Sequence, residues 1–435
     1  MRRLARALAT LLGIVVLGLV VFTMWAWRSA IEPITPPSAA SFDPALVAKG
    51  EKLADAGYCL TCHTPPRGKP YAGGLPMVTA FGTIYSTNIT PDAATGIGNW
   101  SQEAFTRALH EGVARDGSHL FPAFPYDHFT KVSDDDAKAL YAFVMTRPAV
   151  AQTAPPNTLP FPLNVRLLQA GWKLLFFKEG RFQPVTEQSA EWNRGAYLAE
   201  GLSHCGACHT PRNALGAEKK GADAHLAGAA IDGWFAPPLT AANPAPVPWS
   251  AAELHDYLRN GGTPYHGVAA GPMSNVVHQG YALLDDADVN AVASYIASGN
   301  GSADRKADVG QIVGDALARS RYDASQGGDH GAALYTSACA ACHYNPVSGP
   351  LLARPELGLK SSISAPDPTN LVQVVLHGIG VKDGLPGTMM PAFGAGMSDD
   401  DVAAIATYLR KSRTTLSPWT DVPGVVARVR SGKTP

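Results

Sequence analysis

The hydrophobic pattern begins with one long apolar run. Ala7 to Trp27 is a stretch of 21 residues without a charged side chain, with three arginines before it and two tryptophans at its far end. As a helix it is about 30 Å long, which matches the hydrocarbon core of a bilayer. Arginines favour the cytoplasmic side. We therefore expect residues 1–28 to anchor the chain in the inner membrane, with the rest on the periplasmic side. A cleaved signal peptide is the alternative.

Beyond residue 42, amphipathic helical patterns recur in three copies. Opening helices are predicted in "KGEKLADAGY", "RGAYLAEGLSH" and "HGAALYTSA". A middle helix starts at Trp-Ser in two copies ("WSQEAFTRALHEG", "WSAAELHDYLRNGG"), where serine is a typical N-cap, and the third copy has "DPTNLVQVVLHG". Acidic residues precede each closing helix, in which we place Tyr141, Tyr295 and Tyr408 at equivalent positions. This repetition predicts an all-α chain of three similar domains.

Composition sets two limits on this picture. The chain has 435 residues, 46% of them apolar and 16% charged, which is typical of a folded protein of several domains. Its formal net charge of −1 gives no sign of the basic domain that nucleic-acid binding requires. We therefore expect no nucleic-acid partner.

All six cysteines fall in three Cys-x-x-Cys-His motifs, "CLTCH", "CGACH" and "CAACH". The candidate haem-attaching thiols are Cys59, Cys62, Cys205, Cys208, Cys339 and Cys342, and the candidate iron-ligating imidazoles are His63, His209 and His343. This spacing is the attachment signal of c-type haem. A disulfide framework needs no histidine after each pair, and a zinc site would bring two pairs closer together in sequence. The motifs therefore predict three covalently bound haem c groups.

Each copy resembles a class I cytochrome c domain, in which the elements follow the order helix, Cys-x-x-Cys-His motif, loop, helix, ligand loop and closing helix. The resemblance implies three tandem class I cytochrome c domains behind an N-terminal transmembrane helix. The expected segments are the anchor 1–28, the domains 43–150, 188–298 and 325–412, a connecting excursion 151–187 and a short polar tail 413–435. A polar linker, "GNGSADRKADVG", is expected between the last two domains.

In such domains a methionine from the loop before the closing helix is the sixth iron ligand. The second copy has Met273 in "GPMSN", and the third has Met390 in "MMPAFG". We prefer Met390 to Met389 because "MPAF" matches the ligand loop of the family. A thioether ligand raises the reduction potential, which suits an electron carrier.

The first copy has no methionine at this place. In "HLFPAFPYDH" the position is occupied by Phe124, whose side chain cannot bind iron. His128 is the nearest candidate for the sixth ligand, and His119 and His110 are weaker candidates. Bis-histidine ligation lowers the reduction potential relative to His/Met ligation. We therefore expect the first haem to differ in potential from the other two.

With "FGTIYSTNITPDAATGIGNW" after the first motif and "CHTPRN" at the second, the chain resembles the three-haem cytochrome c subunit of membrane-bound periplasmic dehydrogenases. The resemblance implies a redox subunit without a substrate site of its own. It would take electrons from a catalytic subunit of the molybdopterin, PQQ or FAD type and pass them to ubiquinone or a terminal acceptor. "PAFPYDHFTK" and "LPFPLNVRLLQAGWKLLFF" are similar to cytochrome partners of molybdenum hydroxylases, which oxidise aldehydes or N-heterocycles.

Two other functions remain open at this point. One is a stand-alone carrier that docks with a terminal oxidase. The other is a multihaem peroxidase-like enzyme, in which His119, Asp127 and His128 would surround an open first haem.

Two local expectations complete the prediction. The apolar segment Leu163–Phe177 is expected to pack across the first two domains, or else to face the membrane or a catalytic subunit. Pro350 resembles the family proline whose carbonyl accepts a hydrogen bond from the proximal histidine, here His343.

Overall fold

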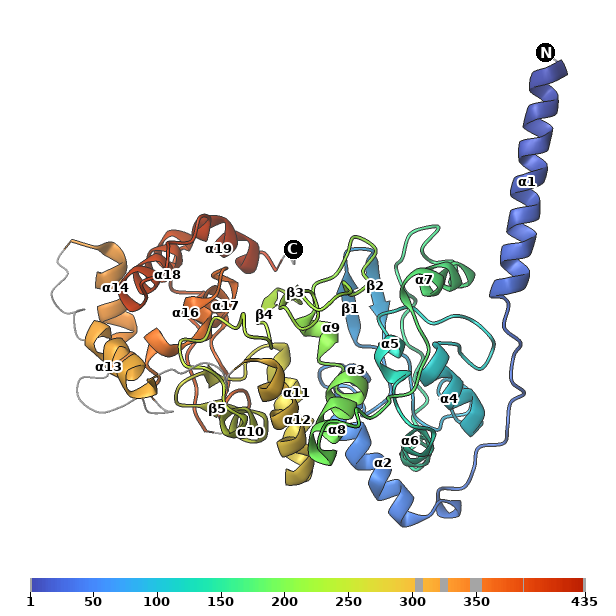
Figure 1. Cartoon of the computed structure of the whole chain (residues 1–435), viewed down its shortest axis with the longest axis horizontal. Coiled ribbons are helices and arrows are strands. Elements are labelled where there is room, and N and C mark those ends of the chain that lie inside the picture. The colour runs from blue at the N-terminus through green and yellow to red at the C-terminus, as the bar shows by residue number, and fades with distance from the viewer. Residues whose placement is uncertain (1, 302–307, 321–327, 345–353, 386, 433–435) are drawn as a thin grey trace. The chain divides into compact units, whose positions relative to one another are not determined.

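The computed structural model describes residues 2–301, 308–320, 328–344, 354–385 and 387–432. In this part of the chain most ordered elements are helices, and the strands form three two-stranded antiparallel hairpins (Figure 1). The chain divides into two compact units, Met1–Ala54 with Cys59–Gln183 and Asp55–Tyr58 with Pro184–Pro435. The expectation of a mainly helical chain is therefore confirmed.

Unit 1 contains the N-terminal helix and the first repeat. Its elements are α1 (Arg2–Ala26), η1 (Ala39–Ser41), α2 (Pro44–Ala56, whose last residues belong to unit 2), α3 (Cys59–Cys62), β1 (Pro76–Thr79), β2 (Gly82–Tyr85), α4 (Gln102–Glu111), α5 (Tyr126–Phe129), α6 (Asp134–Met145), η2 (Arg166–Leu168) and α7 (Gln169–Phe176). Among the described residues, α1 is the one helix long and apolar enough to cross a membrane. Ser101 caps α4 and Ser133 caps α6 through their side chains, as the sequence predicts for α4.

Unit 2 contains the second and third repeats. The elements of the second repeat are α8 (Ala190–Tyr197), the π-helical turn η3 (Leu198–Leu202), α9 (Gly206–His209), β3 (Ala229–Ile231), β4 (Trp234–Ala236), α10 (Ala251–Asn260), β5 (Gly262–Thr263), β6 (Gly267–Val268), α11 (Pro272–His278), η4 (Tyr281–Leu283) and α12 (Asp286–Gly299). The elements that follow are α13 (Val309–Ser320), α14 (His330–Ala338), α15 (Ala340–His343), η6 (Leu357–Leu359), α16 (Ser361–Ser364), α17 (Thr369–His377), α18 (Asp399–Arg413) and α19 (Val422–Arg430).

In every repeat the first and last helices cross at a glycine. The crossing pairs are α2 with α6, α8 with α12 and α14 with α18, and the glycines are Gly50, Gly195 and Gly331. A Cβ atom added at these glycines would lie 2.8, 2.9 and 2.7 Å from the Cβ atom of an aromatic residue on the partner helix, closer than real Cβ atoms approach. Only glycine therefore allows this crossing, and the fold repeats at the level of backbone packing.

These crossings correct one prediction from the sequence. The aromatic residues at the three glycines are Phe143, Tyr295 and Tyr408, so Phe143 is the equivalent of the two tyrosines and Tyr141 is not. Tyr141 lies two residues earlier on α6 and donates a hydrogen bond to the carbonyl of Trp100 at 2.8 Å. Tyr141 was matched to Tyr295 and Tyr408 because all three are tyrosines, whereas the contact at the crossing depends on the position of the residue along the helix.

The C-terminal segment corrects a second prediction, since it is not a polar tail. Its helix α19 packs against α17 and α18, and it buries four valines. These are Val422, Val425, Val426 and Val429. Their spacing of three and four residues gives one apolar helix face. A further helix that the sequence analysis missed, α13, lies between the second and third repeats and packs against η6 and α18.

Candidate haem sites

Each Cys-x-x-Cys-His motif folds as one helical turn, in α3, α9 and α15. In all three the backbone amide of the histidine donates to the carbonyl of the first cysteine, at 3.0 to 3.1 Å. This turn places cysteines that are three residues apart on the same side of the helix. The motif geometry is therefore the one that attachment of both sulfurs to a single haem edge requires.

The Nδ1 atoms of the three motif histidines each contact a backbone carbonyl. The distances are 2.7 Å from His63 to Thr87, 2.6 Å from His209 to Pro237 and 3.3 Å from His343 to Pro355. Because a carbonyl oxygen only accepts, Nδ1 carries the proton and Nε2 is left as the atom that can bind a metal. The structure thus assigns the partner of His343 to Pro355 rather than Pro350, which lies outside the described residues.

The sequence could not reveal these carbonyl partners. They follow their histidines by 24, 28 and 12 residues, so no fixed spacing marks them. A backbone carbonyl can also come from any residue type, which leaves no compositional signal.

Burial disfavours the charged form of the three motif histidines and of two motif cysteines. It lowers the pKa of His63, His209 and His343, while the hydrogen bond to the carbonyl raises it in part. A neutral imidazole is the form that ligates iron. Burial also raises the pKa of the Cys205 thiol to about 12 and that of Cys339 to about 11. The surroundings of Cys205 and Cys339 therefore disfavour a charged thiolate.

The second and third Cys-x-x-Cys-His motifs, which both belong to unit 2, line a single continuous cavity of about 450 Å³, whose surface is mostly apolar. The candidate haem residues on its wall are Cys205, Cys208, His209, Met273, Cys339, Cys342, His343 and Met390. Paired thiols, an imidazole with a free Nε2 and a thioether in an apolar cavity fit haem c. The donor set and its surroundings thus agree with the predicted cofactor.

The two methionines of the third repeat differ in packing. Met390 exchanges backbone hydrogen bonds with Ile379 at 2.9 and 3.0 Å and packs against the hydrophobic core. Met389 also reaches the cavity wall, but its side chain is 63% exposed. This difference supports the preference for Met390.

The walls of this cavity come from both repeats and are joined by hydrogen bonds. Asn370 on α17 forms two bonds with the backbone of Phe235 on β4, at 2.8 and 2.7 Å. Gln373 donates to the carbonyl of Gly233 at 2.7 Å, and Lys360 donates to that of Pro264 at 2.7 Å. The second and third repeats are therefore held in one arrangement around the cavity.

The residues just before the first two motifs meet in unit 2. Tyr58, which precedes Cys59, donates from its hydroxyl to the carbonyl of Ser203 at 2.7 Å and lies 2.9 Å from Nδ1 of His204. Tyr58 and His204 both have positive φ, 36° and 33°, and both line the cavity. Within unit 2, Tyr58 is therefore bound to the residues that lead into the second motif.

The structure separates the candidates for the missing ligand of the first repeat. Both ring nitrogens of His119 are engaged, Nε2 at 2.8 Å from the carbonyl of Ala26 and Nδ1 at 3.0 Å from Nζ of Lys173. His119 is therefore unavailable to iron and to acid–base chemistry. Burial lowers the pKa of His110 to about 4. His128 is buried on α5, and its role as a ligand stays a prediction.

The fold and the motifs define a c-type cytochrome. Residues 47–148 and 193–300 match the family described as cytochrome c. Residues 326–409 match the family described as cytochrome c oxidase, cbb3-type, subunit III.

Three relatives narrow this class. One of the subunits of the nicotinate dehydrogenase of Pseudomonas putida is 45% identical over 412 residues, which are 94% of this chain and 34% of that protein. The chain thus spans about a third of that relative's length. The gluconate 2-dehydrogenase cytochrome c subunit of Pantoea cypripedii is 41% identical over 85% of this chain and 86% of its own. The fructose dehydrogenase cytochrome subunit of Gluconobacter japonicus is 36% identical over 87% of this chain and 81% of its own. The chain belongs to the family of dehydrogenase cytochrome c subunits, which are electron-transfer proteins.

Proposed function

We propose that the chain is the tri-haem c subunit of a membrane-bound periplasmic dehydrogenase. In this role it receives electrons from a catalytic subunit and delivers them to ubiquinone or a terminal acceptor. The observation that carries the proposal is the shared cavity of unit 2, on which the second and third motifs and their methionines converge. One apolar enclosure for two redox sites is the arrangement that an electron relay needs.

The residues of the chain would hold and tune the cofactors. Bound haem c supplies an iron centre that takes up and releases one electron. The cysteine pairs fix the ring, and the carbonyls of Thr87, Pro237 and Pro355 orient the histidines through Nδ1. Met273 and Met390 would complete the second and third sites with a soft ligand that favours a high potential.

The first site is proposed to differ from these two. His128 is buried on the short helix α5, while Phe124, at the family's methionine position, packs its ring on Phe129 at 5.2 Å. We assign His128 as the sixth ligand of the first haem. A second imidazole would lower the potential of this site and give the chain a graded series.

The catalytic partner is proposed to be a molybdenum hydroxylase that oxidises an N-heterocycle or an aldehyde. The relative named for nicotinate dehydrogenase is 45% identical, compared with 41% for the gluconate and 36% for the fructose relative. Nicotinate is an N-heterocycle. The competing assignments are a flavin enzyme that oxidises a sugar or sugar acid and a quinone enzyme that oxidises an alcohol.

The location is proposed to be the periplasmic face of the inner membrane. α1 is 25 residues long, and no residue of its apolar window is buried in the structure. An exposed apolar helix of this length is stable in a bilayer. Covalent attachment of haem c outside the cytoplasm requires the same orientation.

The proposal is tested by solubilising native membranes in a mild detergent and purifying this chain with its partners. The intact mass gives the number of haems, and metal and cofactor analysis identifies the catalytic subunit. We expect three haems and a molybdenum-containing partner. A flavin or quinone partner would replace the branch assignment and keep the relay. Fewer than three haems, or purification without any dehydrogenase under conditions that preserve the complex, would contradict the proposed role.

A further inference from the structure

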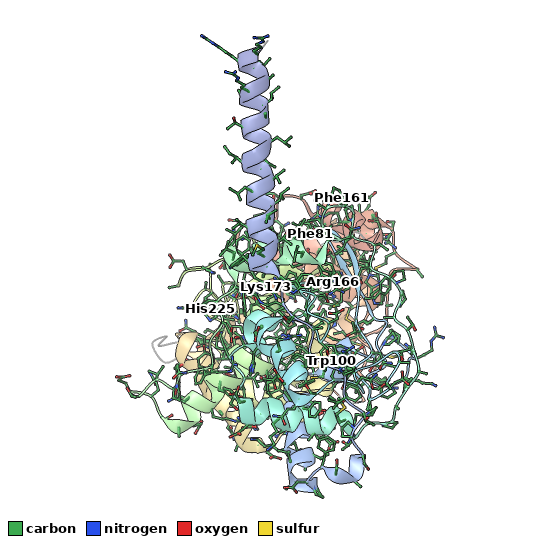
Figure 2. All side chains as sticks on the ribbon, turned by 90° about the vertical axis from the view of Figure 1, so that its right-hand side faces the viewer. Phe81, Trp100, Phe161, Arg166, Lys173 and His225 are labelled. Carbon is green, nitrogen blue, oxygen red and sulfur yellow. The ribbon has the colours of Figure 1, made fainter. Side chains whose placement is uncertain are left out.

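Large apolar side chains of unit 1 are exposed on the segment that packs beside the end of α1. Four of them, all in the excursion, have exposed fractions of 81, 42, 68 and 63%. They are Phe161, Leu168, Leu174 and Leu175, and we call them the α7 surface. Figure 2 places Phe161 on the side of the domain from which α1 extends, and Lys173 beside the lower end of that helix. Several large apolar side chains exposed on one short segment are typical of an interaction site.

α7 is tied to the end of α1 through one side chain, His119. Lys173, which is buried on α7, donates from Nζ to Nδ1 of His119 at 3.0 Å and to the carbonyls of Glu111 and Gly112 at 2.6 and 2.7 Å. Nε2 of His119 donates to the carbonyl of Ala26 at 2.8 Å. Ala26 is the last residue of α1, where carbonyls lack helical partners. His119 therefore caps α1 and holds α7 next to it.

Other contacts fix the same junction. A Cβ atom added at Gly171 of α7 would lie 3.8 Å from the ring of Phe22, so α7 lies against the last turns of α1. After α1, the carbonyl of Ser29 accepts from Arg107 at 2.8 Å, and the amide of Ile31 donates to the carbonyl of Arg115 at 2.8 Å. α1 thus leaves the domain from a bound segment, beside α7.

We propose that the α7 surface enters the interfacial layer of the lipid bilayer beside α1, as a second membrane contact of the chain. The proposal rests on the proposed anchoring by α1. α7 lies against the last turns of α1, and Trp25 and Trp27 at that end are 44 and 67% exposed. Tryptophans belong to the membrane interface, so α7 lies at interfacial depth once α1 spans the bilayer.

The charges at this junction suit a lipid surface. The Arg28 guanidinium is bonded to the carbonyls of Trp25 and Trp27, at the level where headgroups begin. Lys178 follows α7 and is exposed. Leucines that point into the acyl boundary with cations beside them at headgroup depth are the pattern of an interfacial helix. The consequence is that unit 1 is held against the membrane surface rather than tethered at a distance.

The test places a nitroxide spin label on the full-length, haem-loaded chain in lipid nanodiscs. All six cysteines belong to the haem motifs, so an introduced cysteine is the single labelling site. Leu174→Cys reports on the α7 surface. Lys138→Cys is the matched control, because it is exposed on α6 of the same unit, away from the end of α1 (Figure 1). Power saturation compares collisions with oxygen, which concentrates in lipid, and with a water-soluble nickel chelate.

We expect the label at position 174 to favour oxygen and the label at position 138 to favour the nickel chelate. If the chain floats with lipid vesicles and position 174 still favours the nickel chelate, the α7 proposal is wrong and anchoring by α1 stands. If the chain does not float, anchoring itself is wrong. Protection of position 174 from both reagents only when the catalytic subunit is added would identify a protein interface and overturn the lipid assignment.

Discussion

The glycine at the crossing of α8 and α12 offers the sharpest test of how the repeats pack. In Gly195→Ala the new Cβ atom would lie 2.5 Å from the carbonyl carbon of Ala291 and 2.9 Å from Cβ of Tyr295. The carbonyl oxygen of Ala291 is closer still, and ordinary van der Waals contact begins near 3.4 Å, so the helices would have to separate by more than about 1 Å. Sliding is opposed by Arg194, whose guanidinium binds both carboxylate oxygens of Asp288 at 2.7 Å.

The magnitude follows from two opposing terms. Overpacking of this kind costs about 1–3 kcal/mol or more. Alanine in a helix gains about 1 kcal/mol over glycine. Because the clash is with backbone atoms and not with a flexible side chain, we place the cost at the upper end, for a net loss of about 2 kcal/mol. Gly314→Ala on α13 is the matched control, since no atom lies within 4 Å of its Cβ position, and it should gain about 1 kcal/mol.

Hydrogen exchange is the suitable assay because several domains make a single melting temperature ambiguous. A loss of about 2 kcal/mol should speed exchange of the α8 and α12 amides roughly 30-fold, while α14 and α18 keep their rates. Unchanged exchange in Gly195→Ala, or equal effects of both substitutions, would refute the reasoning that close backbone approach sets the crossing.

Four further predictions concern single residues. Burial and the Arg28 charge lower the pKa of Lys173 to about 7, so between pH 7 and about 10.4 the unfolded chain binds one more proton than the folded chain. The free energy of unfolding of unit 1 should therefore rise with pH across this window. In denaturant titrations Lys173→Met should lose this pH dependence. Met273→Ala should lower the potential of one haem in a redox titration, whereas Met389→Ala should leave all potentials in place. His128→Ala should convert one haem to a high-spin spectrum, and an unchanged spectrum would remove His128 as a ligand. Tyr58→Phe loses the bond to Ser203 and should cost about 1 kcal/mol, seen as faster exchange in η3 but not in α18.

Several features of the protein were determined by local sequence. The turn of each Cys-x-x-Cys-His motif, the N-caps at Ser101 and Ser250 and the long apolar helix α1 all depend on residues within a few positions of one another. Their geometry follows from backbone hydrogen bonds and side-chain periodicity, which the sequence displays directly. Membership in the cytochrome family follows from the same motifs.

Other features were decided only by tertiary structure. The carbonyls that orient His63 and His209, the contact of Tyr58 with His204 and the cavity shared by two repeats join residues far apart in the chain. No local pattern encodes them, because a backbone carbonyl has no residue identity and an aromatic side chain fits many surroundings. His119 illustrates the difference. From the sequence it was a candidate iron ligand, whereas in the folded chain it caps the C-terminal end of α1. Local sequence patterns thus determined that the chain binds haem c, and long-range packing determined which side chains are available to act on the haem iron.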